Sequence, residues 1–211
     1  MLQPAQVQLF VLASLALLVV PGPAVLYIIA RSVSQGRLAG VVSAAGVQVG
    51  ASVHIVAAAL GLSAVFLSSA LAFNVVKYLG AAYLIYLGVR QWLAREAVTG
   101  EVMAQPESLQ RVFVQGIIVN VLNPKTALFF FAFLPQFVDP ARGNVTVQVL
   151  LLGLVFVTLA IINDGVYAVL AGALGNGLRS NRRFWSGQRL FAGAVYIGLG
   201  LTTALLVSSN R

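Results

Sequence analysis

The sequence contains no cysteine, one histidine and only five acidic residues, against thirteen Lys and Arg. Without cysteine, the chain has no disulfides, thiolate metal sites or thiol redox chemistry. One histidine and so few acids do not assemble an ordinary metal shell, so we expect neither a metal nor a cofactor. Charged residues make up 9% of the chain and apolar residues 60%, which leaves too little polar surface for a soluble domain. The composition is that of an integral membrane protein.

The net charge of +8 comes from the shortage of acids, because most basic residues stand singly or in pairs between apolar runs. This pattern is typical of charges that flank membrane helices, so we expect no nucleic-acid partner. The first apolar run follows a segment without positive charge and leads into Pro21-Gly22-Pro23 instead of a small-residue cleavage site. We therefore interpret it as a retained span and not as a signal peptide.

Apolar windows of about 20 residues predict an all-α membrane protein that forms a single transmembrane domain. The six predicted spans are residues 7–30, 39–67, 73–93, 112–137, 146–172 and 186–207. Basic residues gather after the first, third and fifth spans, among them Arg31, Arg95 and Arg182. The positive-inside rule places these connections in the cytoplasm and both termini on the outer face.

A polar linker at about residues 95–110 separates a first half, about 1–94, from a second half, about 111–211. The halves show weak self-similarity in the same order at three places, of which the first aligns residues 19–30 with residues 121–132. Each half has three spans, an odd number, so the second half enters the membrane from the opposite face. We therefore predict two inverted repeats, an arrangement typical of alternating-access transporters.

Proline interrupts the first and fourth spans at Pro21-Gly22-Pro23 and Asn123-Pro124-Lys125. Proline suits the first position of a helix, and Gly or Asn suits the N-cap before it, so we expect a half-helix to begin at Pro23 and at Pro124. Their N–H groups and positive dipole ends would attract an anion such as a carboxylate. The alternative is a pair of proline kinks that serve helix packing alone.

Lys125 and Asp164 are the charges that the sequence places inside spans. Each costs about 2.5–3.5 kcal/mol on insertion scales, so such residues usually face the bundle interior and have partners. One interpretation is a structural ion pair between them. The other is a site for a zwitterion, in which Lys125 and the half-helix termini receive a carboxylate and Asp164 receives an ammonium. Asp164 is also the predicted carrier of a proton between the two faces.

The spans contain further polar residues with less specific signals. His54 is either a hydrogen-bonded packing residue or part of a proton path. Gln48, Asn120 and Asn163 are candidates to line a cavity. Glycines at four-residue spacing, such as Gly46 and Gly50, indicate close helix packing.

With six spans, the two proline triplets and Asp164 in the fifth span, the whole chain resembles the LysE/RhtB family of bacterial amino-acid exporters. The resemblance implies export of amino acids or close derivatives through the inner membrane, driven by the proton motive force, and leaves a homo-oligomer open. Its expected partners are thus an amino acid, a proton and membrane lipid. Because Asp164 is the one spare intramembrane anion, the residues favour a neutral substrate, of the homoserine, threonine or leucine type, over lysine or arginine.

The breaks and the intramembrane polar residues themselves point to substrate binding by the two triplets, Asn163 and Asp164, and to proton coupling through Asp164 and His54. The substrate-binding candidates are Pro21, Gly22, Pro23, Asn123, Pro124, Lys125, Asn163 and Asp164. Two other classes of function stay open at this point. A membrane-embedded enzyme would need a nucleophile with its base, or a metal, and a non-transporting membrane scaffold would leave the polar breaks without a purpose.

Overall fold

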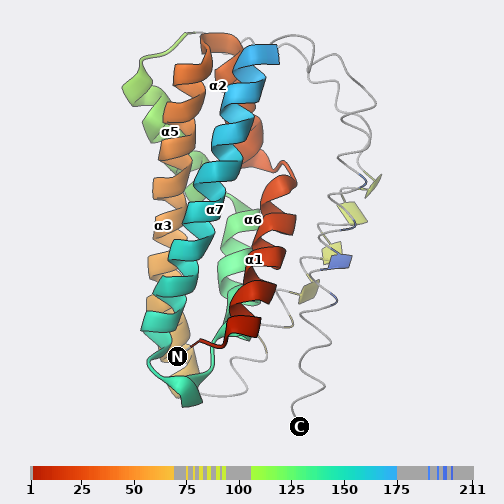
Figure 1. Ribbon diagram of the computed structural model, residues 1–211, viewed down its shortest axis with the longest axis vertical. Helices are drawn as coiled ribbons and strands as arrows, with labels where there is room; N and C mark the ends of the chain where they lie inside the picture. Colours follow the sequence, from red (N-terminus) through yellow and green to blue (C-terminus); the bar gives the residue numbers. More distant parts are fainter. Residues whose placement is uncertain are drawn as a thin grey trace.

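The computed structural model of the chain describes residues 2–68 and 106–174, together with isolated helical positions between 75 and 93 and between 190 and 201. Within this part of the chain every regular element is a helix, and the helices form an elongated bundle (Figure 1). The predicted spans at 73–93 and 186–207 and the predicted linker lie largely outside the described residues. The six-span topology and the inverted repeat therefore stay predictions.

Two long helices, α3 (Arg37–Ser68) and α7 (Val145–Leu174), run the length of the bundle and pack against each other (Figure 1). Their 32 and 30 residues correspond to about 45–48 Å at 1.5 Å per residue. That length exceeds the roughly 30 Å of a bilayer's hydrocarbon core. Both are apolar and long enough to span a membrane, and they coincide with the predicted spans at 39–67 and 146–172.

Two bent helix pairs complete the described bundle. Helix α1 (Pro4–Val19) meets α2 (Pro23–Gln35) at 51°, and α5 (Leu109–Val121) meets the segment Pro124–Phe137 at 48°. If each pair counts as one span, the described residues contain four candidate spans. The pairs coincide with the predicted spans at 7–30 and 112–137.

Both breaks fall at the predicted prolines. Helix α2 begins at Pro23 with Gly22 as its N-cap. Helix α6 (Pro124–Leu128) begins at Pro124, and the Asn123 side chain accepts a hydrogen bond of 3.1 Å from the Lys125 backbone N–H. The prediction that a helix begins at each proline is confirmed.

The segment after α6 departs from α-helical geometry. It continues as a π-helix, η1 (Phe129–Phe133), and a 3₁₀-helix, η2 (Leu134–Phe137), and a further 3₁₀ turn, η3 (Pro140–Arg142), follows. Proline lacks an N–H and its ring collides with the carbonyl four residues earlier, so Pro135 prevents a regular α-helix here.

Buried aromatic rings fill the half of the bundle that contains α1. The Phe10 ring lies 5.3 Å from that of Phe137 and 5.7 Å from that of Phe129, and Phe129 lies 4.9 Å from Phe156 of α7. These rings, with Phe130 and Phe133, are at most 6% exposed. We refer to these six residues as the aromatic cluster.

Helices α3 and α5 approach each other at glycines. A Cβ atom on Gly50 would lie 2.6 Å from the Ile117 carbonyl oxygen, and one on Gly116 would lie 2.7 Å from the Ser43 carbonyl oxygen. At Gly46 a Cβ would collide with the backbone of Phe113. The prediction that Gly46 and Gly50 serve close helix packing is confirmed.

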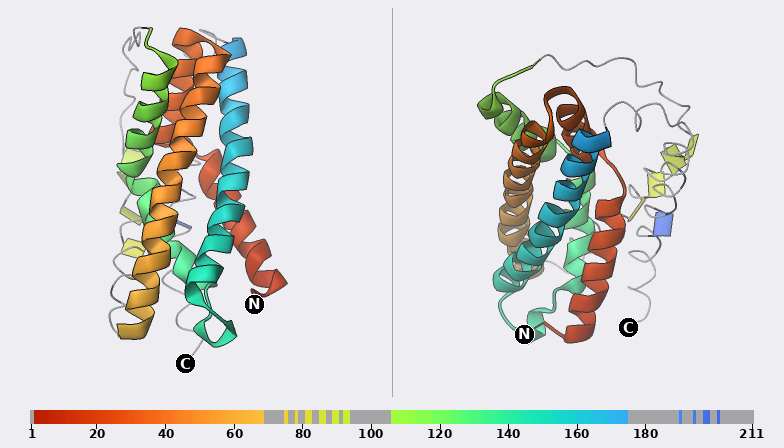
Figure 2. Two further views of the ribbon diagram at one scale, coloured as in Figure 1. Left: turned by 90° about the vertical axis from the view of Figure 1, so that its left-hand side faces the viewer. Right: turned by 45° about the horizontal axis from the view of Figure 1, so that its top comes forward.

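The C-terminal end of α2 and the start of α5 lie at the end of the bundle opposite the N-terminus (Figure 2). A network of polar side chains connects them. Arg31 donates hydrogen bonds of 2.8 Å to Glu107 and 2.7 Å to Gln115, and the Tyr27 hydroxyl donates to the Val112 carbonyl at 2.8 Å. The bond from Arg31 holds the pKa of Glu107 below its usual value. We call this the Arg31–Glu107 network.

Candidate functional site: a small cavity between the two helix breaks

The two breaks touch each other inside the bundle. Lys125, in the first turn of α6, donates a hydrogen bond from Nζ to the Val20 carbonyl at the end of α1. A Cβ atom on Gly22 would lie 2.9 Å from Lys125 Cδ. The Gly22 backbone has φ −108°, which any residue adopts, so glycine is required here for space and not for its conformation. The path of the Lys125 side chain therefore depends on Gly22.

Four consecutive carbonyls at the end of α1, those of residues 17–20, each receive a hydrogen bond. Val20 N–H bonds the Leu17 carbonyl at 3.2 Å, and Lys125 bonds the Val20 carbonyl. The other two donors come from α7: Asn163 Nδ2 bonds the Leu18 carbonyl at 3.2 Å, and the Tyr167 hydroxyl bonds the Val19 carbonyl at 2.8 Å. Helix ends leave such carbonyls without intrahelical partners, and a bilayer offers no water to satisfy them. Side chains from other helices stabilise the break instead.

The second break is organised around Asn120, near the end of α5. Its Nδ2 donates to the Val47 carbonyl of α3 at 2.7 Å, and its Oδ1 accepts from Thr126 Oγ1 at 2.9 Å. His54 Nε2 lies 2.9 Å from the Asn120 carbonyl oxygen. A carbonyl only accepts, so His54 donates in this contact. His54 thus stabilises the second break, and its predicted proton role has no contact with Asp164 to support it.

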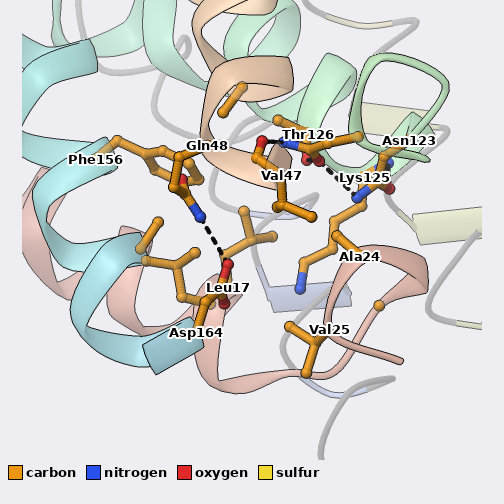
Figure 3. A pocket seen from close by; sticks show the side chains of 15 residues that line it. Leu17, Ala24, Val25, Val47, Gln48, Asn123, Lys125, Thr126, Phe156 and Asp164 are labelled. Atoms are coloured by element: carbon orange, nitrogen blue, oxygen red, sulfur yellow. Dashed lines mark hydrogen bonds between the residues drawn. The ribbon is translucent and has the colours of Figure 1, made fainter. Parts of the chain in front are cut away.

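A cavity of about 30 Å³ lies between the two breaks (Figure 3). This is room for roughly two water molecules, each needing about 10–15 Å³, and it is too small for an amino acid. Apolar and polar residues of α1, α2, α3, α5, α6 and α7 line it: Leu17, Leu18, Gly22, Ala24, Val25, Val47, Gln48, Ala51, Asn120, Asn123, Lys125, Thr126, Phe156, Ala160 and Asp164. An amino acid therefore needs a wider cavity than the one described.

Two unlike charges face this cavity without pairing (Figure 3). Lys125 is 6% exposed and Asp164 3%. The Asp164 carboxylate accepts from Gln48 Nε2 at 2.7 Å and from Asn163 Nδ2 at 3.0 Å. Among the ion pairs of the described residues, none joins Lys125 to Asp164. The structural ion pair considered from the sequence is thus not a direct contact here.

The two half-helices differ at their N-termini. In α6 the Asn123 side chain already occupies the Lys125 N–H. In α2 no side chain of the described residues caps the first turn, and Ala24 and Val25 line the cavity. The first N–H groups of a helix have no intrahelical partner, and the dipole favours an anion there. The start of α2 is therefore uncapped by side chains of the described residues and has Lys125 beside it.

The structure brings half of the predicted substrate-binding residues to the cavity wall. Gly22, Asn123, Lys125 and Asp164 line it, whereas the wall as described does not include Pro21, Pro23, Pro124 or Asn163. Helices α2 and α6 begin at Pro23 and Pro124. Asn163 donates hydrogen bonds to the Leu18 carbonyl and to the Asp164 carboxylate. The cavity wall includes the predicted Gln48 and Asn120.

Sequence reasoning missed Tyr167 and Thr126. Tyr167 follows Asp164 by three residues, a spacing that puts both on one face of a helix, and this spacing is a usable signal. Thr126 directly follows the second triplet, but nothing in the sequence distinguishes it from other threonines in the chain.

Comparisons with known proteins give the family of the chain. The family model described as "LysE type translocator" matches residues 15–207. A homoserine/homoserine lactone efflux protein of Salmonella typhimurium is 34% identical over 96% of each chain. An uncharacterized membrane protein of Vibrio cholerae is 32% identical over 92% of this chain and 94% of its own. No solved structure matches the chain.

Replacing Gly22 with alanine should destabilise the protein, and the cause should be the collision of the new Cβ atom with the Lys125 side chain. The added Cβ overlaps Lys125 Cδ, so we expect Gly22→Ala to lower the free energy of unfolding by about 1–3 kcal/mol, the usual cost of overpacking. In a Lys125→Ala background the same change should cost much less, because the colliding atoms are absent. Thermal unfolding of the four purified proteins in detergent measures this coupling. Gly61→Ala, where a Cβ meets no atom within 4 Å, is the control, and equal costs in both backgrounds would contradict the contact.

Proposed function

Because the chain belongs to the family of LysE-type translocators, we propose that it exports neutral amino acids of the homoserine type across the bacterial inner membrane. The family and the name of the Salmonella relative point to an amino-acid transporter and not to an enzyme or a passive scaffold. The identity of the substrate, its coupling to protons and the orientation in the membrane are parts of this proposal.

The observation that carries the proposal is the unpaired arrangement of Lys125 and Asp164 in one cavity. An amino acid is a zwitterion, and its two charges match these two side chains. The carboxylate binds Lys125 and the first N–H groups of α2, and the ammonium binds Asp164. Burying a charge inside a membrane is energetically costly, and the residues that carry such charges usually line a substrate or ion path. The proposed function therefore accounts for the presence of Lys125 and Asp164 inside the bundle.

The charge count of the cavity favours a neutral amino acid. Lys125 and Asp164 are the charged residues in its described wall. A lysine or arginine substrate would bring a second positive charge for which this wall has no further anion, and an unpaired charge is costly to bury. A hydroxyl such as that of homoserine needs only hydrogen-bonding groups, which Asn120 and Thr126 provide nearby.

Coupling to the proton motive force follows from competition at Asp164. A protonated carboxyl binds an ammonium poorly, so a proton taken up from the outer face releases the substrate there. Loss of that proton to the cytoplasm restores the anion for the next substrate. His54, at the second break, is a secondary candidate for this proton path. Lipid surrounds the bundle, and a homo-oligomer remains compatible with this cycle.

Packed side chains lie beside the cavity toward both ends of the bundle. Phe156 of the aromatic cluster forms part of its wall on the side of α1. Toward the other end, Ala24 and Val47 pack with Tyr27, which belongs to the Arg31–Glu107 network. Alternating access requires the packing on the two sides to open in turn around a fixed site, as inverted-repeat transporters do.

Transport assays separate the roles of the two charges. In everted vesicles with a pH gradient, Asp164→Asn should insert normally but lose gradient-driven homoserine uptake. Lys125→Ala should weaken homoserine recognition about ten-fold or more, the loss of one charge-assisted hydrogen bond. It should affect homoserine lactone much less, because the lactone has no free carboxylate. Arg142→Ala removes an exposed basic residue at the far end and should leave both activities unchanged. Accumulation by Asp164→Asn at the normal rate would refute the proton role.

The orientation is tested by single cysteines in this cysteine-free chain. Ser34 lies near the end of α2 and Asn144 just before α7, at opposite ends of the bundle. An impermeant thiol reagent added outside intact cells should modify Asn144→Cys and leave Ser34→Cys unmodified. The reverse pattern would place the termini in the cytoplasm and reverse the direction of transport in this proposal.

A further inference from the structure

The side-chain amide of Gln48, on α3, forms a hydrogen bond through Nε2, whereas its Oε1 has no hydrogen-bond partner in the part of the chain that the structure describes. Its side chain lines the cavity and the residue is 7% exposed. Nε2 donates to Asp164 Oδ2 at 2.7 Å. Within the described residues nothing donates to Oε1, although this oxygen is buried. Buried polar atoms of this kind are rare in folded proteins, and each one calls for an explanation.

The carboxylate of Asp164 fixes the orientation of the Gln48 amide. A carboxylate accepts hydrogen bonds and an amide oxygen cannot donate, so Nε2 must face Asp164 and Oε1 must face away from it. The Asp164 carboxylate is held from its other oxygen by Asn163 Nδ2 at 3.0 Å. Two residues that line the cavity therefore carry an anion and, one amide group away, a buried neutral acceptor without a donor among the described residues.

An acceptor to which no described residue donates, on the residue that also contacts the Asp164 carboxylate, suits a ligand group that donates more than one hydrogen bond. A primary ammonium has three N–H groups and no acceptor. The Asp164 carboxylate already accepts hydrogen bonds from Gln48 and Asn163. An ammonium bound there therefore needs a further acceptor for its other N–H groups, because burial removes the water that bound them. An acceptor that has no donor before substrate arrives also loses no internal hydrogen bond when substrate binds.

We propose that Gln48 Oε1 and the Asp164 carboxylate together bind the substrate ammonium, each accepting a different N–H. Gln48 is then a binding residue that selects substrates with at least two ammonium N–H groups. This inference deepens the proposed function and rests on it. A site in which Gln48 only positions Asp164 would make no such distinction between primary and heavily methylated amines.

The test compares homoserine with N,N-dimethylhomoserine, whose ammonium keeps one N–H. Binding to the purified protein is measured by competition against labelled homoserine. In the wild-type protein the dimethyl compound should bind more weakly, since one acceptor has no N–H to bind. Gln48→Met keeps a similar volume and removes both amide atoms. We expect it to weaken homoserine binding about ten-fold and the dimethyl compound little, so the ratio of the two affinities should fall about ten-fold.

Equal weakening of both compounds would show that Gln48 acts only through Asp164 and would overturn the inference. Unchanged homoserine binding in Gln48→Met would overturn it as well. Gln48→Asn, which withdraws the amide by one methylene, is the second variant if Gln48→Met unfolds, and the same fall in the ratio is expected. The control is Ser14→Ala on α1, which removes another buried, unpartnered oxygen away from the cavity wall. If the wild-type protein fails to bind homoserine, the proposed function fails and not this inference alone.

Discussion

The structure depends on one constraint: a helix that breaks inside a membrane must find donors for its freed carbonyls within the protein. At the end of α1 these donors are Lys125, Asn163 and Tyr167, which come from α6 and α7. The break in the first bent pair is therefore held by the second bent pair and by the long helix beside it. The same contacts bring the buried Lys125 and Asp164 to the wall of one cavity. The hydrogen bonds that satisfy the freed carbonyls therefore also assemble the polar site.

The surroundings of this site define what must move during transport. The cavity of about 30 Å³ holds water but not an amino acid. On one side it meets the aromatic cluster, and on the other the apolar layer beneath the Arg31–Glu107 network. The rings of the cluster sit on α1, on the irregular segment η1–η2 and on α7. Because π- and 3₁₀-turns have poorer hydrogen-bond geometry than an α-helix, we expect η1–η2 to rearrange more easily than the regular helices beside it.

Local sequence signals predicted the breaks and the long helices, because proline, its N-cap residue and apolar length act over a few residues. The start of α2 at Pro23 and of α6 at Pro124 were predictable for this reason. Contacts over long separations were not. Nothing local shows that Tyr167 bonds a carbonyl 148 residues away, or that the Gln48 amide meets Asp164 across 116 residues. The cap that Asn123 forms on the Lys125 N–H is a local contact. The difference between the capped start of α6 and the start of α2, which no described side chain caps, appears only when the two breaks are compared.

The central claim is that the two unpaired charges of one cavity bind the two charges of an amino acid. Calorimetric titration of the purified wild-type protein tests it with three ligands of matched skeleton. Homoserine carries both charges, 4-hydroxybutanoate lacks the ammonium and 3-aminopropanol lacks the carboxylate. The account predicts that each truncated ligand binds at least about ten-fold more weakly than homoserine, because each leaves one buried charge without its partner. Binding of either truncated ligand with the affinity of homoserine would contradict the account.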